Sequence, residues 1–417
     1  MSQFRALSGA ALVALLVACG GGSDPPVSGG PPPPPGGLPP PASAPPLKTN
    51  LAARYGVVNF PVGAAIEPLS TTNADRDVLL KHFSSITAEN VMKPAAVWPN
   101  APGTSGSTAL PATQPDFTSA DLLADFAFNN GIQLRGHTLL WHQSAPDWFF
   151  AGDTSNPVNY RILVQQRLRD YIYAVVRRYP NIYAWDVVNE VATDAPNAAN
   201  PYRTNSPWYI AYSVGGQDGT EYVRDAFLFA SQARADILRN SATMKLMLND
   251  YNTELPAKRA NVIAIVQDLI DAGVPIDGVG HQFHLQLGAD VGQVTAAFTA
   301  VEALSSTFVN HVTELDVSIY QDPGECFSQR TIPPCMADYG ATAPTSALRQ
   351  QATLYRSLFT AFDRPSVTSI TTWGVADNHT WLNSFPVTRT NHPLLFDTVR
   401  NPKAAFWAVV DPGFAIP

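Results

Sequence analysis

Eight short apolar runs of six to nine residues recur along this chain, with stretches of helical periodicity between them. The helical stretches include 164–179 and 257–273, and Gly131 and Gly273 stand where a left-handed residue would end a helix before the next strand. Strands that alternate with helices predict a parallel sheet. The expected strands are 58–66, 85–90, 132–139, 184–190, 245–251, 277–284, 311–317 and 369–374.

Polar residues gather at the carboxyl ends of nearly all these strands. An open doubly wound sheet would leave several of these ends far from any shared crevice, whereas a closed barrel brings all of them to one mouth. Periodicity alone does not separate the two arrangements, but the clustering and the count of eight favour an α/β fold, a single (β/α)8 TIM barrel. The residues concerned are Glu89, Asn90, His137, Asn189, Glu190, Asn249, Asp250, Gln282, His284, Glu314, Asp316 and Trp373.

Two glutamates stand on such strands: Glu190 closes the run AWDVVNE, and Glu314 lies within HVTELD. Hydrolysis of a glycosidic bond needs two carboxyl groups facing the bond, one to protonate the leaving oxygen and one to attack the sugar carbon. A barrel supplies that geometry because its working residues lie at the strand ends. The pair therefore indicates a glycoside hydrolase, and a solvated glutamate at the start of a helix is the structural alternative for Glu190.

Seven short runs of distinctive sequence occur in order over about residues 58–407. They are ITAENVMKP (86–94), RGHTLLWH (135–142), WDVVNE (185–190), NDYN (249–252), GVGHQFHL (278–285), TELDV (313–317) and TTWGVADNHTW (371–381). Taken together, these runs resemble glycoside hydrolase family 10, the endo-β-1,4-xylanases. The resemblance implies an endo-acting, retaining enzyme that cleaves internal β-1,4-xylosidic bonds of xylan by double displacement, with xylan and xylo-oligosaccharides as ligands and no cofactor.

The resemblance also implies roles for individual residues. Glu190 matches the acid/base, which must hold a proton near neutral pH, and Glu314 matches the nucleophile, which must stay ionised. Asn189 matches the residue that bonds the sugar 2-hydroxyl, while His284 and Asp316 match positions that orient the nucleophile. A retaining enzyme predicts carboxyl groups about 5–5.5 Å apart, against about 6.5–9.5 Å for an inverting one.

Further positions match the family's sugar-binding pattern. Tryptophan and histidine are also common core residues, and Glu89 with Lys93 could form a surface ion pair of little worth. One departure puts a bond to the distal sugar in doubt, because the family often has glutamine where Ser144 stands and Gln143 comes one place early. The expected substrate-binding residues are Glu89, Asn90, Lys93, His137, Trp141, Gln282, Trp373 and Trp381.

Two other functions fit many of the same residues. An endo-β-1,4-glucanase on the same barrel would use Glu190 and Glu314 equally well, and turnover on xylan against carboxymethyl-cellulose separates the two. A surface glycan-binding protein is the alternative that is not an enzyme. Such proteins usually lose one carboxylate, and both are present here.

The N-terminus has the pattern of an export signal over residues 1–18. Arg5 precedes the apolar run 7–18, which is too short to span a bilayer as a mature helix but is typical of a signal peptide. The following LVAC resembles the bacterial lipobox, in which Cys19 would be lipidated. Ordinary secretory cleavage nearby is the alternative.

A Pro/Gly-rich linker is expected over 19–49, followed by one catalytic barrel over 50–417. A segment of that composition cannot bury a core and would act as an extended spacer. The expected protein is exported and anchored by lipid at the outer membrane, the cell surface or the periplasm, with a secreted form as the alternative.

Cys326 and Cys335 form an even pair if Cys19 carries lipid. Exported proteins meet oxidising conditions, so we expect a disulfide that braces the loop 320–340, with two free thiols as the alternative. Neither cysteine has a CxxC or histidine neighbour, and no metal site is expected. The net charge of −8 without a basic cluster argues against nucleic acid as a partner, and we expect a monomer.

Overall fold

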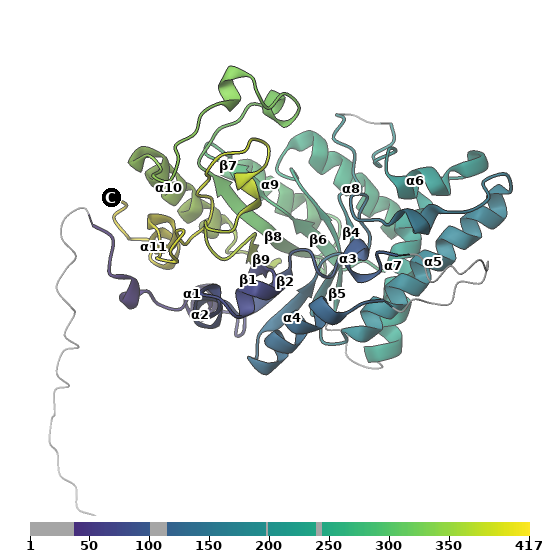
Figure 1. The fold of residues 1–417 in the computed structure, drawn as a ribbon, viewed down its shortest axis with the longest axis horizontal. Coiled ribbons are helices and arrows are strands. Elements are labelled where there is room, and N and C mark those ends of the chain that lie inside the picture. Colours follow the sequence, from purple (N-terminus) through teal and green to yellow (C-terminus); the bar gives the residue numbers. More distant parts are fainter. Residues whose placement is uncertain (1–36, 101–114, 197–198, 239–243) are drawn as a thin grey trace, which may run out of the picture. The chain divides into compact units, whose positions relative to one another are not determined.

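All eight expected strands form, and they close into a parallel barrel (Figure 1). The computed structural model describes residues 37–100, 115–196, 199–238 and 244–417. Neighbours run β1–β2–β3–β4–β5–β6–β8–β9, and β9 pairs back to β1. This is the predicted (β/α)8 barrel. The strands are β1 Val62–Ile66, β2 Ser85–Ala88, β3 Gln133–Gly136, β4 Ala184–Asn189, β5 Lys245–Asp250, β6 Gly278–His281, β7 His284–Gln286, β8 Val309–Ser318 and β9 Val367–Thr372.

Two strands differ from their expected form. The run 277–284 divides into β6 and β7 because Phe283 adopts a left-handed backbone (φ 53°), which interrupts the ladder. The short β7 then pairs with β8 alone, with His284 opposite Asp316. The first expected strand, 58–66, begins only at Val62, since Asn59 is also left-handed (φ 59°).

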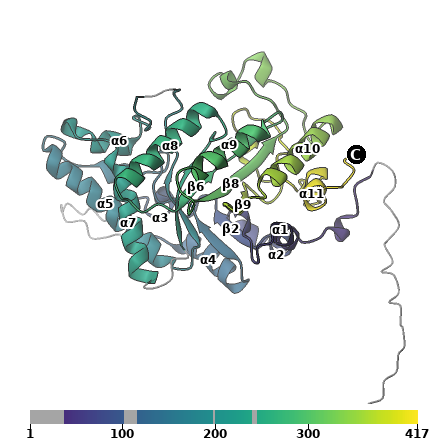
Figure 2. The ribbon, with the colours of Figure 1, turned by 180° about the vertical axis from the view of Figure 1, so that it is seen from behind.

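Helices lie outside the barrel and pack against one another around it, as α8, α9 and α10 do in Figure 2. Helix α5 shows why: Val164, Leu168, Ile172 and Val175 are buried at helical spacing and face the core. The helices are α1 Leu47–Tyr55, α2 Asp75–His82, α3 Pro94–Val97, α4 Thr118–Asn129, α5 Pro157–Arg178, α6 Pro207–Tyr212, α7 Glu221–Leu238, α8 Pro256–Asp271, α9 Val291–Glu302, α10 Thr345–Ala361 and α11 Ala404–Val410.

Helix ends follow the local sequence. Helices α3, α5, α6 and α8 each begin on a proline, which has no amide hydrogen to leave unpaired at the first turn. Gly131 and Gly273 have positive φ (63° and 66°) just after α4 and α8, as their positions in the sequence predicted. Each glycine ends a helix and directs the chain towards the next strand.

The compact unit spans Leu38–Pro417 and therefore begins before residue 50. Ala44 and Leu47 are buried in the core, so the last part of the predicted linker 19–49 belongs to the folded unit. The predicted signal peptide and Cys19 lie outside the described residues. Among the described residues, none of the helices is long and apolar enough to cross a membrane.

A segment over residues 320–340 projects from the barrel after β8, in green at the top of Figure 1. It contains two short 3-10 turns, η5 Gly324–Phe327 and η6 Pro333–Cys335. Cys326 and Cys335 are bonded to each other, which confirms the predicted disulfide.

Candidate active site

The predicted site residues lie at the carboxyl ends of the strands. Glu190 follows the last residue of β4, and Glu314 lies within β8. Glu190 has a left-handed backbone conformation (φ 57°). This conformation costs a non-glycine residue about 1–3 kcal/mol, and such residues are concentrated at functional sites. Its amide N–H donates to the carbonyl of Asn249 (2.9 Å), which fixes the turn against β5.

The carboxyl group of Glu190 accepts two hydrogen bonds. The Trp141 indole Nε1–H donates to Oε2 (2.8 Å), and Gln282 Nε2 donates to Oε1 (3.1 Å). Burial, together with the nearby charges of Asp250 and Glu314, outweighs these bonds and raises the pKa of Glu190 to about 7. A carboxyl group in this position keeps its proton in a large fraction of molecules at neutral pH.

Glu314 sits in the opposite electrostatic environment. Asn249 Nδ2 donates to its Oε1 (2.8 Å) and His284 Nε2 donates to its Oε2 (3.1 Å). Burial alone would raise the pKa of Glu314, but the hydrogen bond from His284 and the electrostatic effects of His137 and His284 leave it below its usual value. Glu314 is therefore a carboxylate at neutral pH.

His284 carries the positive charge that stabilises this carboxylate. Its Nδ1 donates to Asp316 Oδ2 (2.9 Å), which in turn also accepts the indole N–H of Trp381 (2.8 Å). Burial opposes the charge, yet Asp316 and Glu314 together raise the pKa of His284 to about 10. Asp316, His284 and Glu314 thus form a hydrogen-bonded chain that fixes the orientation of the Glu314 carboxylate.

Amide side chains connect the two glutamates across the mouth. Asn189 Oδ1 accepts from Asn249 Nδ2 (2.9 Å) and from Gln282 Nε2 (3.2 Å). Each donor also bonds one of the glutamates, Asn249 to Glu314 and Gln282 to Glu190. The two carboxyl groups therefore belong to one hydrogen-bonded site, although they come from strands far apart in the sequence.

The residues expected to hold the sugars beyond the reacting bond form a second polar group at the ends of β2 and β3. Lys93 Nζ donates to Asn90 Oδ1 (2.8 Å) and lies over the Trp141 ring (4.7 Å). Burial lowers the pKa of Lys93, against the attraction of Glu314, Glu89, Glu190 and Glu67. His137 Nδ1 lies 3.0 Å from Asp186 Oδ2 beneath this group.

The three expected tryptophans lie around these groups. The Trp373 ring stands edge-to-face with His137 (5.3 Å) and near His284 (6.3 Å). Trp381 contacts His284 (4.8 Å), and Trp141 holds Glu190 through its indole nitrogen. The indole nitrogens of Trp141 and Trp381 are bound by carboxylates, so their rings offer mainly apolar faces to a ligand.

Four residues of this site were not assigned a role in it from the sequence. Asn249 bonds both Asn189 and Glu314, and buried Asp250 raises the pKa of Glu190. Both lie in the NDYN run, whose place at a strand end was the available signal. Glu67 accepts from Asn90 (2.6 Å) and His379 Nε2 donates to Glu89 (3.2 Å). Glu67 directly follows the first expected strand and His379 lies in the run 371–381, so these places in the sequence were the available signals.

Ser144, at the exchanged position, is buried and accepts the Ala95 amide N–H (3.2 Å), while Gln143 is exposed.

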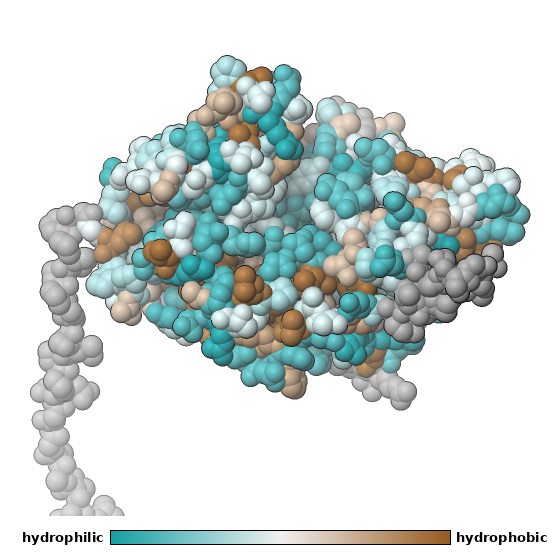
Figure 3. Space-filling model, viewed as in Figure 1, coloured by the Kyte–Doolittle hydropathy of each residue, from teal (hydrophilic) through white to brown (hydrophobic). Residues whose placement is uncertain are grey.

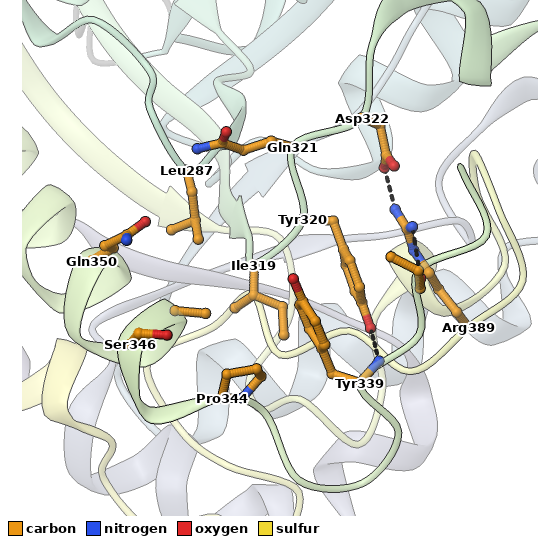
Figure 4. A pocket seen from close by; sticks show the side chains of 12 residues that line it. Leu287, Ile319, Tyr320, Gln321, Asp322, Tyr339, Pro344, Ser346, Gln350 and Arg389 are labelled. Carbon is orange, nitrogen blue, oxygen red and sulfur yellow. Dashed lines mark hydrogen bonds and ion pairs between the residues drawn. The ribbon is translucent and has the colours of Figure 1, made fainter. Parts of the chain in front are cut away.

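Within the described ranges no group of three or more His, Cys, Asp or Glu side chains could hold a metal ion. A pocket of about 360 Å³ beneath the projecting segment includes neither glutamate and is lined by Tyr320, Tyr339 and Arg389 among others (Figure 4). This pocket is therefore separate from the site that contains the two glutamates.

Known proteins share this barrel and much of its sequence. A thermostable celloxylanase from Thermoclostridium stercorarium is 40% identical over 367 residues, which are 85% of this chain and 85% of the relative. The crystal structure of xylanase B from Clostridium stercorarium F9 is 40% identical and matches 88% of this chain and 100% of its own with a TM-score of 0.73. A mutant structure in complex with xylotriose is 30% identical and matches 87% of this chain and 98% of its own with a TM-score of 0.72.

The model of a single family matches nearly the whole barrel. It is described as glycosyl hydrolase family 10 and matches residues 49–412, a range that contains every strand and both glutamates. A match of this extent, on a closed barrel whose mouth joins the two glutamates, shows that the chain belongs to glycosyl hydrolase family 10.

Proposed function

We propose that this protein is an endo-β-1,4-xylanase that cleaves internal bonds of xylan with retention of configuration. The observation that supports this most strongly is the opposite protonation of two carboxyl groups in one site. The pKa of Glu190 is raised to about 7, whereas that of Glu314 lies below its usual value. One group can donate a proton at the pH at which the other can attack, as a double displacement requires.

In the first step Glu314 attacks the anomeric carbon of the sugar on the glycone side. The carbon–oxygen bond to the leaving sugar breaks, and the proton of Glu190 passes to the departing oxygen. The product is an ester between the sugar and Glu314, with Glu190 now ionised. The positive charge of His284 keeps Glu314 ionised and oriented before the attack.

In the second step Glu190 acts as a base. It takes a proton from water as the water oxygen attacks the same carbon, and the ester bond to Glu314 breaks. Both glutamates return to their starting protonation states. Because each step inverts the anomeric carbon, the configuration is retained overall. The carboxyl separation of about 5–5.5 Å remains a prediction for this chain.

Asn189 is well placed to bind the sugar 2-hydroxyl. Its Oδ1 accepts from both Asn249 and Gln282, so its Nδ2 amino group is the part of the side chain that a sugar hydroxyl can engage. We assign Glu89, Asn90, Lys93 and His137 to the glycone sugars and the three tryptophans to the apolar faces of the sugar rings. These assignments rest on the family pattern and on the grouping of the residues at the barrel mouth.

Xylan is the preferred substrate because the related proteins are named for it. A β-1,4-xylanase from Dictyoglomus thermophilum is 36% identical over 356 residues, and the mutant structure described above was solved with xylotriose. The test is digestion of xylan with the purified protein, with product size followed by chromatography and product anomer by NMR. Early release of mixed-length β-anomeric oligosaccharides is expected; monomeric xylose alone or α-anomeric products would refute the proposal.

An endo-β-1,4-glucanase activity is the second candidate. It is favoured by the name of the Thermoclostridium relative, a celloxylanase, and by the fact that Glu190 and Glu314 would serve either sugar. Parallel assays on xylan and carboxymethyl-cellulose separate the two. Higher kcat/KM on carboxymethyl-cellulose would make the glucanase the main activity.

We also propose that the protein is exported and anchored by lipid at Cys19, and that it acts as a monomer. The apolar run 7–18 before LVAC supports the anchor, and the disulfide fits an oxidising compartment. Metabolic labelling with an alkynyl fatty acid should tag the wild type but not Cys19→Ala, and light scattering should give the mass of one chain. Labelling that survives Cys19→Ala would exclude this anchor.

A further inference from the structure

The tip of the projecting segment presents an aromatic side chain to solvent. Phe327 lies directly after Cys326 and is 45% exposed, while both cysteines of the disulfide are buried. In Figure 3 the segment stands beside a hollow in this face of the barrel. A single exposed phenylalanine is common on protein surfaces, but this ring is held next to a disulfide and beside a hollowed face, where it is available to a ligand.

Phe327 is the outer end of a row of rings that starts at His284, beside Glu314. Trp381 contacts His284 and stacks on Phe385 with ring centres 5.2 Å apart and planes at 18°. Phe385 then meets Phe327 edge-to-face at 5.7 Å. The row therefore continues the tryptophan wall outward from the reacting centre to the tip of the segment.

The base of the segment is fixed by Arg389. This side chain pairs with Asp322, lies 3.6 Å over the Tyr320 ring, and donates to the carbonyls of Cys335 (3.3 Å) and Ala337 (3.0 Å). Figure 4 shows Arg389, Asp322 and Tyr320 together at one side of the pocket beneath the segment. The base is thus held by an ion pair and hydrogen bonds that do not involve the disulfide.

The disulfide acts only on the tip. It joins η5 to η6, two turns of the same segment nine positions apart, and links no two elements of the barrel. Breaking it would leave the barrel intact but free the short loop that carries Phe327. The disulfide therefore restrains Phe327. A ring that is already restrained loses less conformational entropy when a ligand binds to it.

We propose that Phe327 forms a binding platform for a xylosyl residue of the bound chain that lies beyond the sugars at the scissile bond. Phe385 has Trp381 stacked on its ring and the Arg330 guanidinium over it (5.2 Å), so we assign the sugar contact to Phe327. This inference rests on the proposed function. The apolar C–H face of a pyranose ring packs on aromatic rings, and the row is continuous with Trp381, the wall of the reacting site. One exposed ring is too small an apolar surface for a stable protein interface, which favours a sugar as the occupant.

The experiment compares kcat/KM on xylohexaose with kcat/KM on xylotriose. Phe327→Ala should lower the value on the hexamer about three- to tenfold, through KM, and leave the trimer unchanged, because one aromatic contact is lost. Phe128→Ala on α4 is the matched control, since Phe128 is 77% exposed and lies outside this row. The double variant Cys326→Ser, Cys335→Ser should change the ratio in the same direction as Phe327→Ala, with the melting temperature little changed.

The outcomes are distinct. An unchanged hexamer-to-trimer ratio in an active Phe327→Ala protein overturns the platform. So does a variant whose kinetics match the wild type while its solution mass changes, which would make the tip a contact between copies of the chain. A wild-type protein inactive on both oligosaccharides refutes the proposed function, and the platform with it.

Discussion

The ends of β4 and β8 carry the same side chain in opposite surroundings. Glu190, after β4, is partly buried near the negative charge of Asp250, and its pKa is raised to about 7. Glu314, on β8, is more deeply buried but faces His284, and its pKa falls below the usual value. Burial acts in the same direction on both, so the sign of the neighbouring charge decides which glutamate keeps a proton.

This contrast shows that the two roles are made by neighbours rather than by the glutamates themselves. Each neighbour is itself fixed by a further partner: Asp250 pairs with Lys258 (3.0 Å), and His284 is held by Asp316.

The contrast also predicts how the hydrolytic activity depends on pH. Activity should rise as pH rises through the lowered pKa of Glu314 and fall as pH rises through about 7, where Glu190 loses its proton.

The largest effect is expected at the β8 end. Glu314→Ala should lower turnover of xylan about 10⁴- to 10⁶-fold, because no other group in the site can form the covalent intermediate. Added azide should restore some cleavage and give a glycosyl azide of inverted configuration, since Glu190 can still protonate the leaving sugar. Steady-state kinetics and NMR of the product check both points, with Glu221→Ala on α7 as the control.

Removal of the other glutamate should cost less and leave a different signature. Glu190→Ala should reduce xylan turnover about 10²- to 10⁴-fold through loss of acid catalysis. Azide should rescue this variant as a glycosyl azide of retained configuration, because Glu314 still forms the ester that azide then attacks. If both variants gave azides of the same configuration, the two roles would have been assigned wrongly.

Loss of the cation beside Glu314 should move one limb of the pH profile. His284→Gln should lower kcat/KM about 10- to 100-fold, as expected when a charge-assisted hydrogen bond is lost. The pKa of Glu314 should rise without this cation, so activity in acid would be lost at a higher pH than in the wild type. A pH series of kcat/KM checks this, and His284→Lys, which keeps a positive charge, should shift the acidic limb less.

The smallest effect is expected from the charge beside Glu190. Asp250→Asn removes a negative charge that raises the pKa of Glu190, so the alkaline limb should move to lower pH while activity near pH 5 changes little. Asp236→Asn, a surface variant on α7, is the control and should leave the limb in place. Melting temperatures would show whether the loss of the buried partner of Lys258 has damaged the fold; an unmoved limb in a folded protein would contradict the role given to Asp250.

Much of this site could be predicted from the sequence because its residues stand at strand ends. Glu190, Glu314, Gln282 and His284 lie in runs whose alternation of strand and helix implies a barrel, and a barrel gathers such ends by its topology. The disulfide was predictable for a similar reason, since Cys326 and Cys335 are close in the chain and only a short loop has to close.

Other features were decided by contacts between segments that are distant in the sequence. The left-handed backbone of Phe283 that divides β6 from β7, and that of Glu190 after β4, depend on the strands packed against them. The same holds for Trp381, whose indole is bound by Asp316 and whose ring stacks towards the disulfide-braced tip.

By itself the sequence determined the fold class and the pair of glutamates, because strand periodicity and residue type are local properties of the chain. The sequence assigned the proton to Glu190 only through the family resemblance, and only the tertiary structure supplied the physical reason. A pKa depends on burial and on charges a few ångströms away, and Asp250 and His284 reach their positions beside Glu190 and Glu314 only when the barrel has closed.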